Sequence, residues 1–206
     1  MKPAAHLALQ QRAREEQGEK RLAKKGASAG WTMTELLSKR LWSQLGMERE
    51  ARITVDADGK CGVSGGLLCT PRDLVRLGRA LSAGGRSQSG AQLIPESFLE
   101  DTMSPDEEAR QRYSKADPYG LAYQNSFWIL KGESKRHRPS LMAYGIHGQV
   151  LWVDPSAELV VVKLATSESP MDDQEYTQVM EALLAVRRAL RSRDQPAEQN
   201  DALSGV

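Results

Sequence analysis

QVLWVDPSAELVVVKLA, residues 149–165, decides the fold, because two apolar runs flank a short turn-forming segment. Gln149–Asp154 and Leu159–Ala165 are rich in β-branched and aromatic residues, and Pro155–Glu158 between them is typical of a turn. The stretch therefore predicts an antiparallel β-hairpin whose second strand is mostly buried. Ser126–Leu130 predicts one more strand, so we expect a thin sheet of two or three strands.

Helical signals surround this hairpin. Capping residues predict helix starts at Thr32, Thr70 and Pro95, and the charged segment 104–118 predicts a surface loop. A long final helix is predicted around residues 176–190, with arginines near its C-terminus where the helix dipole favours cations. Helices, then strands, then a closing helix indicate an α+β fold class.

The chain divides into three parts by composition. Residues 1–30 predict a charged, partly disordered arm, because seven Lys or Arg against three Glu between Lys2 and Lys25 leave a charge of +4. Residues 31–192 carry the periodic apolar pattern of a folded portion. Residues 193–206 are polar and without periodicity, which predicts a disordered tail.

The overall composition excludes several classes of protein. Among 206 residues, 28 Lys and Arg nearly balance 27 Asp and Glu, which argues against binding nucleic acid through a basic surface. No apolar run approaches the roughly 18 residues of a membrane helix, so we expect a cytoplasmic protein that does not enter a membrane. Cys61 and Cys69 lack a second pair or a neighbouring histidine, so no metal site is expected, and no cofactor either.

Gly62–Gly66 matches the G-x-S-x-G pattern, which makes Ser64 a candidate nucleophile. That chemistry needs a buried strand before the serine and a helix directly after it. The sequence predicts neither, and small residues at most positions favour a turn. Tyr123–Asn125 matches a Y-x-N pattern that occurs beside serine nucleophiles, but its place before an aromatic run favours a strand entry.

Tyr144–Gln149 contains two glycines that flank Ile146 and His147 at the start of a strand. Glycines at this place allow a ligand to approach the backbone closely, and free N–H groups can stabilise an oxyanion. A β-bulge with an ordinary surface histidine is the alternative. The residues alone leave both open.

Several segments in the same order resemble serine β-lactamase-related hydrolases. They are GWTMTELLSKRLWSQLGMEREARITVD (residues 30–56), VSGGLLCTPRDLVRLGRAL (residues 63–81) and YGIHGQVLWVDPSAELVVVKLAT (residues 144–166). The G-I-H-G-Q form is most similar to the 6-aminohexanoate-dimer hydrolase branch. The resemblance spans roughly Trp31 to Arg191.

This resemblance implies a serine hydrolase that cleaves amides, lactams or esters through an acyl-enzyme. It also implies a partial β-lactamase/transpeptidase-like fold, in which an antiparallel sheet remnant and a C-terminal helix pack beside a helical region. Ile146, His147 and Gly148 correspond to the family's third motif, which lines the substrate site and lends a backbone N–H to the oxyanion hole.

One departure from the family changes the expected function. The family's nucleophile is the serine of S-x-x-K, yet no lysine of this chain has serine three positions before it. The residue at that position is Leu36 for Lys39 and Val160 for Lys163. The family also places this motif and its tyrosine ahead of the Trp31 segment. We therefore expect a truncated, C-terminal portion of such a hydrolase that is inactive alone.

Two alternatives remain from the sequence. The chain can be a non-catalytic binding or complementing module, which pairs through an exposed sheet edge with an N-terminal companion fragment or with itself. It can also be an independent hydrolase that uses Ser64 and His147. The small-molecule partner in the family is an amide or ester.

Overall fold

The computed structural model describes residues 31–62, 65–114 and 117–193. The expected arm, residues 1–30, lies outside these ranges, as do residues 194–206 of the expected tail and the candidate nucleophile Ser64. No helix among the described residues combines the length and the apolar character needed to cross a membrane.

The capping signals of the sequence are confirmed by the helices. Thr32 accepts a hydrogen bond from the Glu35 amide at 3.2 Å, and the Glu35 carboxylate accepts one from the Thr32 amide at 2.8 Å, which completes a capping box. Thr70 caps the next helix and Pro71 fills its first position. The helices are α2 (Met33–Leu37), continued by a π-helical turn (Ser38–Trp42), α3 (Pro71–Ser82), α4 (Glu96–Met103), α5 (Glu107–Ser114) and α6 (Asp173–Arg193).

The sheet is larger than the sequence predicts. It is a five-stranded antiparallel meander in the order β3-β4-β5-β6-β7. The strands are β3 (Ala122–Gln124), β4 (Phe127–Leu130), β5 (Ser140–Gly145), β6 (Gln149–Asp154) and β7 (Leu159–Lys163). The predicted hairpin is confirmed as β6 and β7, while β3 and β5 were not expected. The expected loop at 104–118 is also wrong, because it contains α5.

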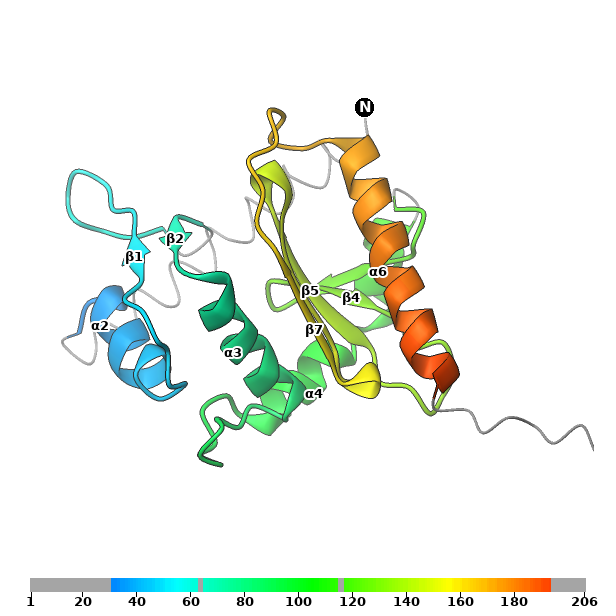
Figure 1. Ribbon diagram of the computed structural model, residues 1–206, viewed down its shortest axis with the longest axis horizontal. Helices are drawn as coiled ribbons and strands as arrows, with labels where there is room; N and C mark the ends of the chain where they lie inside the picture. The colour runs from blue at the N-terminus through cyan, green and yellow to red at the C-terminus, as the bar shows by residue number, and fades with distance from the viewer. Residues whose placement is uncertain (1–30, 63–64, 115–116, 194–206) are drawn as a thin grey trace, which may run out of the picture.

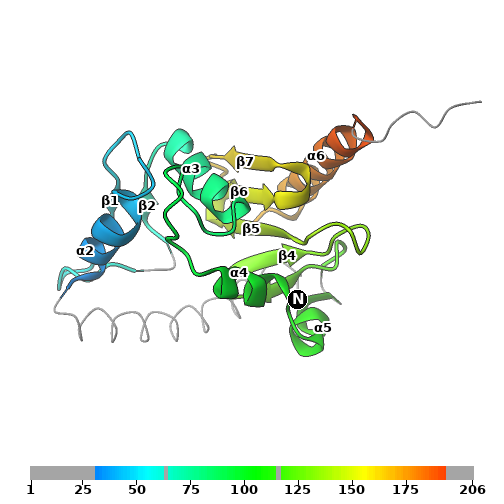
Figure 2. The same ribbon diagram turned by 90° about the horizontal axis from the view of Figure 1, so that it is seen from below.

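Helices cover both faces of this sheet. Alternate residues of each strand point to opposite faces, so Val150 and Trp152 of β6 pack toward α6, whereas Leu151 and Val153 pack toward α3 and α4. Figures 1 and 2 show α6 on one side of the sheet and α3 on the other, with α2 and the short β1 (Arg52–Ile53) and β2 (Leu67–Leu68) ribbon beyond α3. The observed layers are those of an α+β fold.

Helix α3 is held on both of its sides. The Asp73 carboxylate, fully buried, accepts the Glu48 amide at 2.8 Å and thereby fastens α3 to the segment that follows α2. On the sheet side, a Cβ at Gly78 would lie 2.4 Å from Cγ1 of Val160, so only glycine allows this close approach to β7. The helical region and the sheet are thus joined through α3.

Strand β7 forms one edge of the sheet. It pairs with β6 along its inner side, and within residues 31–62, 65–114 and 117–193 no strand pairs with its outer side. Its residues are all half-buried, because α3 covers one face and α6 the other. The edge therefore combines unpaired backbone groups with apolar side chains.

Candidate functional site

The turn between β5 and β6 is the candidate substrate-side element. Residues Ile146–Gly148 form a single tight turn between Gly145, which ends β5, and Gln149, which begins β6. His147 has φ 56° and Gly148 has φ 79°, so two successive residues adopt left-handed backbone. For a residue with a side chain, that conformation costs on the order of 1–3 kcal/mol and persists only when its surroundings hold it. The turn is therefore a fixed and strained element at the end of the sheet.

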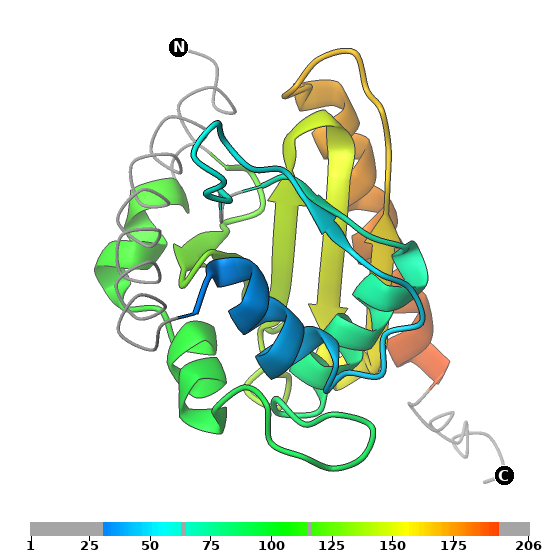
Figure 3. The same cartoon turned by 90° about the vertical axis from the view of Figure 1, so that its left-hand side faces the viewer.

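Neighbouring backbone holds His147 in place. Its amide donates to the carbonyl of Pro170 at 2.9 Å, and its Nδ1 lies 2.7 Å from the carbonyl of Ser167. Because a carbonyl only accepts, Nδ1 carries the hydrogen in this contact, which leaves Nε2 of the neutral ring as an acceptor. Figure 3 shows the β5–β6 turn and the segment leading into α6 at the same end of the sheet.

Gly148 sits against an ion pair. Nζ of Lys163 donates to the Gly148 carbonyl at 3.0 Å and to Oε1 of Glu175 at 2.6 Å. The hydrogen bonds from Lys163 and then Ser167 hold the pKa of the Glu175 carboxyl below its usual range. Gly148 suits its positive φ, and a Cβ there would lie 2.4 Å from Oε1 of Glu175, so a larger residue would displace the ends of the Glu175 and Lys163 side chains.

Ile146 is the exposed tip of the turn. It is 58% exposed. The Gln149 side chain links the turn to the segment after β7. Its Nε2 donates to the His147 carbonyl at 3.1 Å, and its Oε1 accepts from the Ala165 amide at 3.2 Å. The turn thus presents an apolar side chain and rigid backbone, while the oxyanion role that the resemblance implies for Ile146, His147 and Gly148 stays a prediction.

The surroundings of the G-x-S-x-G segment differ from those of a nucleophile elbow. Ser64 itself lies outside the described residues. Directly after Gly66 the chain enters the short strand β2, and helix α3 begins only at Pro71. A nucleophile elbow needs a strand before the serine and a helix directly after it. The pairing of Ser64 with His147 stays a prediction.

The Y-x-N segment has a structural explanation. Tyr123 is buried at 4% exposure in the core, and its ring lies 4.7 Å from that of Trp128. Asn125 turns the chain with φ 50° and donates to Oδ2 of Asp101 at 2.8 Å and to Oγ1 of Thr102 at 3.0 Å. Tyr123 thus belongs to a separate strand, β3, which the sequence did not predict, and Asn125 makes the turn into β4.

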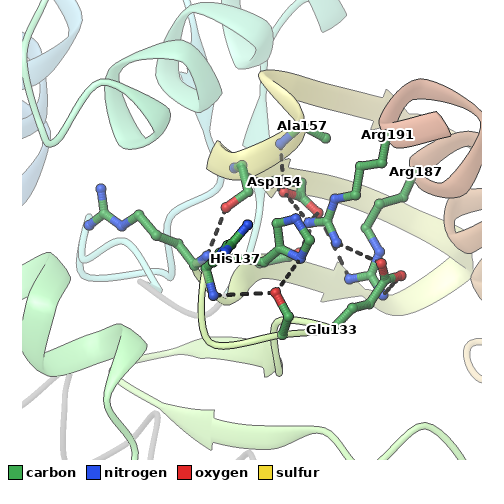
Figure 4. A network of polar contacts seen from close by, with 11 residues as sticks. Glu133, His137, Asp154, Ala157, Arg187 and Arg191 are labelled. Atoms are coloured by element: carbon green, nitrogen blue, oxygen red, sulfur yellow. Dashed lines mark hydrogen bonds and ion pairs between the residues drawn. The ribbon is translucent and has the colours of Figure 1, made fainter. Parts of the chain in front are cut away.

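A buried ion network fastens the C-terminal end of α6. Arg187 and Arg191 each lie 2.9 Å from the Glu133 carboxylate, and Arg191 also donates to both oxygens of the fully buried Asp154 at 3.1 Å (Figure 4). His137 lies beside this network, with its Nδ1 3.1 Å from the Ser134 hydroxyl. The sequence pattern attributes these arginines to the helix dipole and misses the ion pairs, whose partners are far apart in sequence.

The described part of the chain contains no cluster of three or more His, Cys, Asp or Glu that could hold a metal ion. Cys61 and Cys69 are free thiols, both half-buried. Burial, and to a smaller extent the charge of Asp73, raise the pKa of the Cys69 thiol, so this thiol is a weak nucleophile.

Comparison with known proteins places these features in a family. The family described as Beta-lactamase matches residues 6–185. A 6-aminohexanoate-dimer hydrolase from Paenarthrobacter ureafaciens is 34% identical over 164 residues, which are 78% of this chain and 40% of that protein. The chain thus spans about 40% of the length of this relative.

Solved structures show the same relation. A putative 6-aminohexanoate-dimer hydrolase from Bacillus anthracis is 28% identical with a TM-score of 0.67, over 79% of this chain and 40% of that chain. Simvastatin synthase (LovD) from Aspergillus terreus, at 16% identity and a TM-score of 0.56 over 80% of this chain and 51% of that chain, shares the fold. The architecture is a partial β-lactamase/transpeptidase-like fold, and the chain belongs to the beta-lactamase family of hydrolases.

Proposed function

We propose that this chain is the substrate-side, C-terminal portion of a serine hydrolase that cleaves amide or ester bonds, and that it is catalytically silent by itself. In such an enzyme a serine hydroxyl gives its proton to a base and attacks the carbonyl carbon, and the oxyanion that forms receives backbone N–H bonds. The scissile bond then breaks, the amine or alcohol leaves with a proton, and water hydrolyses the acyl-enzyme to the free acid and serine. The turn at Ile146–Gly148 would provide backbone for the oxyanion, but not the His147 amide, which already donates to the Pro170 carbonyl. The missing part is the S-x-x-K serine with its lysine.

The observation that carries the proposal is the combination of a held turn with an absent nucleophile motif. His147 and Gly148 keep left-handed backbone through contacts with Pro170, Ser167 and Lys163. Holding a strained conformation without a local stability gain is typical of a functional site. The sequence meanwhile offers no serine three residues before any lysine. The 6-aminohexanoate-dimer hydrolase relative supports linear amides as the substrate class.

Turnover assays test the first half of this proposal. Purified protein should hydrolyse p-nitrophenyl esters, nitrocefin and a linear 6-aminohexanoate dimer no faster than buffer does, and Ser64→Ala should change nothing. Clear turnover that disappears in the Ser64→Ala variant would overturn the proposal in favour of an independent hydrolase.

A chimera tests the second half. Residues 31–191 of this chain replace the matching segment of the full-length Paenarthrobacter relative, which retains its own S-x-x-K region. The chimera should hydrolyse the dimer, and the same chimera with Gly148→Val should fold but lose most turnover, because the turn cannot keep its backbone. A folded chimera without activity contradicts the assignment of these residues to the substrate side.

The open edge of β7 favours a second candidate function, a complementing module. The side chain of Leu164, which directly follows β7, is 47% exposed, and such an edge accepts a further strand. A companion polypeptide that carries the remaining part of the fold, or a second copy of this chain, would supply that strand.

Association measurements distinguish this candidate. We expect oligomers in light scattering, or rapid hydrogen exchange of Leu159–Ala165 in any monomer. Leu164→Lys should abolish association, whereas Leu67→Lys, at a similarly exposed site on β2, should not. A stable monomer whose β7 amides are all slow to exchange would rule the module out.

A further inference from the structure

We propose that Glu175 is a positioning residue for the Ile146–Gly148 turn, acting through Lys163 on one side and Ser167 on the other. The role in catalysis rests on the proposed function, whereas the control of the turn does not. Glu175 belongs to the first turn of α6, and neither the sequence motifs nor the family resemblance singles it out.

The first route runs through Lys163. Oε1 of Glu175 lies 2.6 Å from Nζ of Lys163, which also donates to the Gly148 carbonyl at 3.0 Å. The two side chains are only 22% and 35% exposed, so water competes little for these contacts. A lysine committed to two acceptors is fixed in place, and its ammonium then holds the carbonyl of the left-handed Gly148.

The second route runs through Ser167. The Ser167 side chain lies near the Glu175 carboxylate and is among the groups that lower the pKa of that carboxyl. The backbone of Ser167 in turn meets His147 twice, since its carbonyl faces Nδ1 at 2.7 Å and its amide donates to the His147 carbonyl at 3.4 Å. The carboxylate therefore holds Gly148 through Lys163, and it lies beside the segment whose backbone holds His147.

The neighbouring groups fit this assignment. Burial raises the pKa of the Tyr144 phenol to about 12, and the charges of Glu175 and Asp172 contribute to the rise. Tyr144 therefore keeps its proton at neutral pH and cannot serve as a base. Nζ of Lys163 is hydrogen-bonded to both Glu175 and the Gly148 carbonyl, which gives it a structural role. The cluster around Glu175 holds the turn and leaves proton transfer to residues elsewhere.

Hydrogen exchange and imidazole NMR on this chain test the positioning role directly. In Glu175→Ala the His147 amide, bonded to the Pro170 carbonyl, should exchange about tenfold faster, because a hydrogen bond to a charged group contributes at least that much. The His147 ring should shift from one Nδ1–H tautomer toward a mixture. Glu175→Gln, which retains an acceptor for both partners, should restore most of the protection.

Glu181→Ala, at an exposed site on the same helix, is the matched control and should leave the His147 signals unchanged. If Glu175→Ala leaves the exchange rate and tautomer of His147 as in the wild type, or if Glu181→Ala changes them equally, the proposal is wrong.

The chimera described above adds the catalytic readout. There Glu175→Ala should lower kcat about tenfold with little change in KM, since an oxyanion contact acts in the transition state. An equal loss in the Glu175→Gln chimera, or a change in KM alone, would overturn the positioning role in catalysis. An inactive parent chimera would overturn the proposed function, and the exchange data would still judge Glu175.

Discussion

Replacing Gly78 by alanine sets helix propensity against packing at the contact between α3 and the sheet. Propensity alone predicts that alanine in the middle of a helix stabilises the protein by about 1 kcal/mol. The new Cβ, however, would lie 2.4 Å from Cγ1 of Val160 and 3.2 Å from Cδ1 of Leu151. Ordinary carbon contacts are about 3.5–4.0 Å, and overpacking a core costs roughly 1–3 kcal/mol, occasionally more. Since the overlap with Val160 is severe, the packing cost should lie toward the upper end of that range, at about 2–3 kcal/mol. After the propensity gain of about 1 kcal/mol is subtracted, we expect Gly78→Ala to lower the free energy of unfolding by about 1–2 kcal/mol.

A second substitution isolates the cause. Val160→Ala removes the methyl groups that meet the new Cβ and leaves space on the half-buried β7, at a cost of about 1–2 kcal/mol. In the double variant the alanine at position 78 fills that space. The double variant should therefore be more stable than the sum of the single effects predicts, by about 1–2 kcal/mol, well beyond the usual scatter of independent sites.

Urea unfolding followed by far-UV circular dichroism and by tryptophan fluorescence measures these values, and coincident transitions verify two-state behaviour. Val162→Ala on the same strand and face is the control, and its effect should add to that of Gly78→Ala. A more stable Gly78→Ala variant, or equal coupling with both valines, would refute the close packing of α3 on β7.

Two further predictions concern buried carboxylates. Asp154→Ala should destabilise the protein by about 3–5 kcal/mol in urea unfolding, because it leaves the buried guanidinium of Arg191 without this partner; a loss below about 1 kcal/mol would contradict the ion network. Burial alone would raise the pKa of Asp73, but hydrogen bonds from the Glu48 amide and the Thr70 hydroxyl lower it overall. The stability from Asp73 is therefore present above about pH 4, the usual value of an unfolded Asp, and is lost as pH falls through the folded pKa. Acid titration of unfolding should show this loss, and Asp73→Asn should lack it; parallel curves for the two proteins would contradict the lowered pKa.

Helix starts and the central hairpin were predictable because their signals are local. A cap such as Thr70 bonds to a residue three positions away, so the sequence contains the whole motif. The hairpin of β6 and β7 likewise carries its turn between its strands. Strand β5 was missed because Leu141–Ala143 lacks β-branched residues and gains its order from pairing on both sides.

Long-range polar contacts could not be predicted in the same way. Glu133 and Arg187 are separated by more than fifty positions, and only the folded chain brings them together. At the candidate site, Gly145 and Gly148 signalled an unusual turn, but nothing local indicated that His147 takes left-handed backbone. The role of Glu175 was hidden for the same reason, since its contacts depend on where α6 begins relative to β7.

The most direct test of the central claim is the intact mass of the purified wild-type protein after incubation with a fluorophosphonate and, separately, with a penicillin. Both reagents acylate or phosphonylate an activated serine. A protein without an activated serine should keep its unmodified mass with either reagent. A stoichiometric adduct on any serine would contradict the claim.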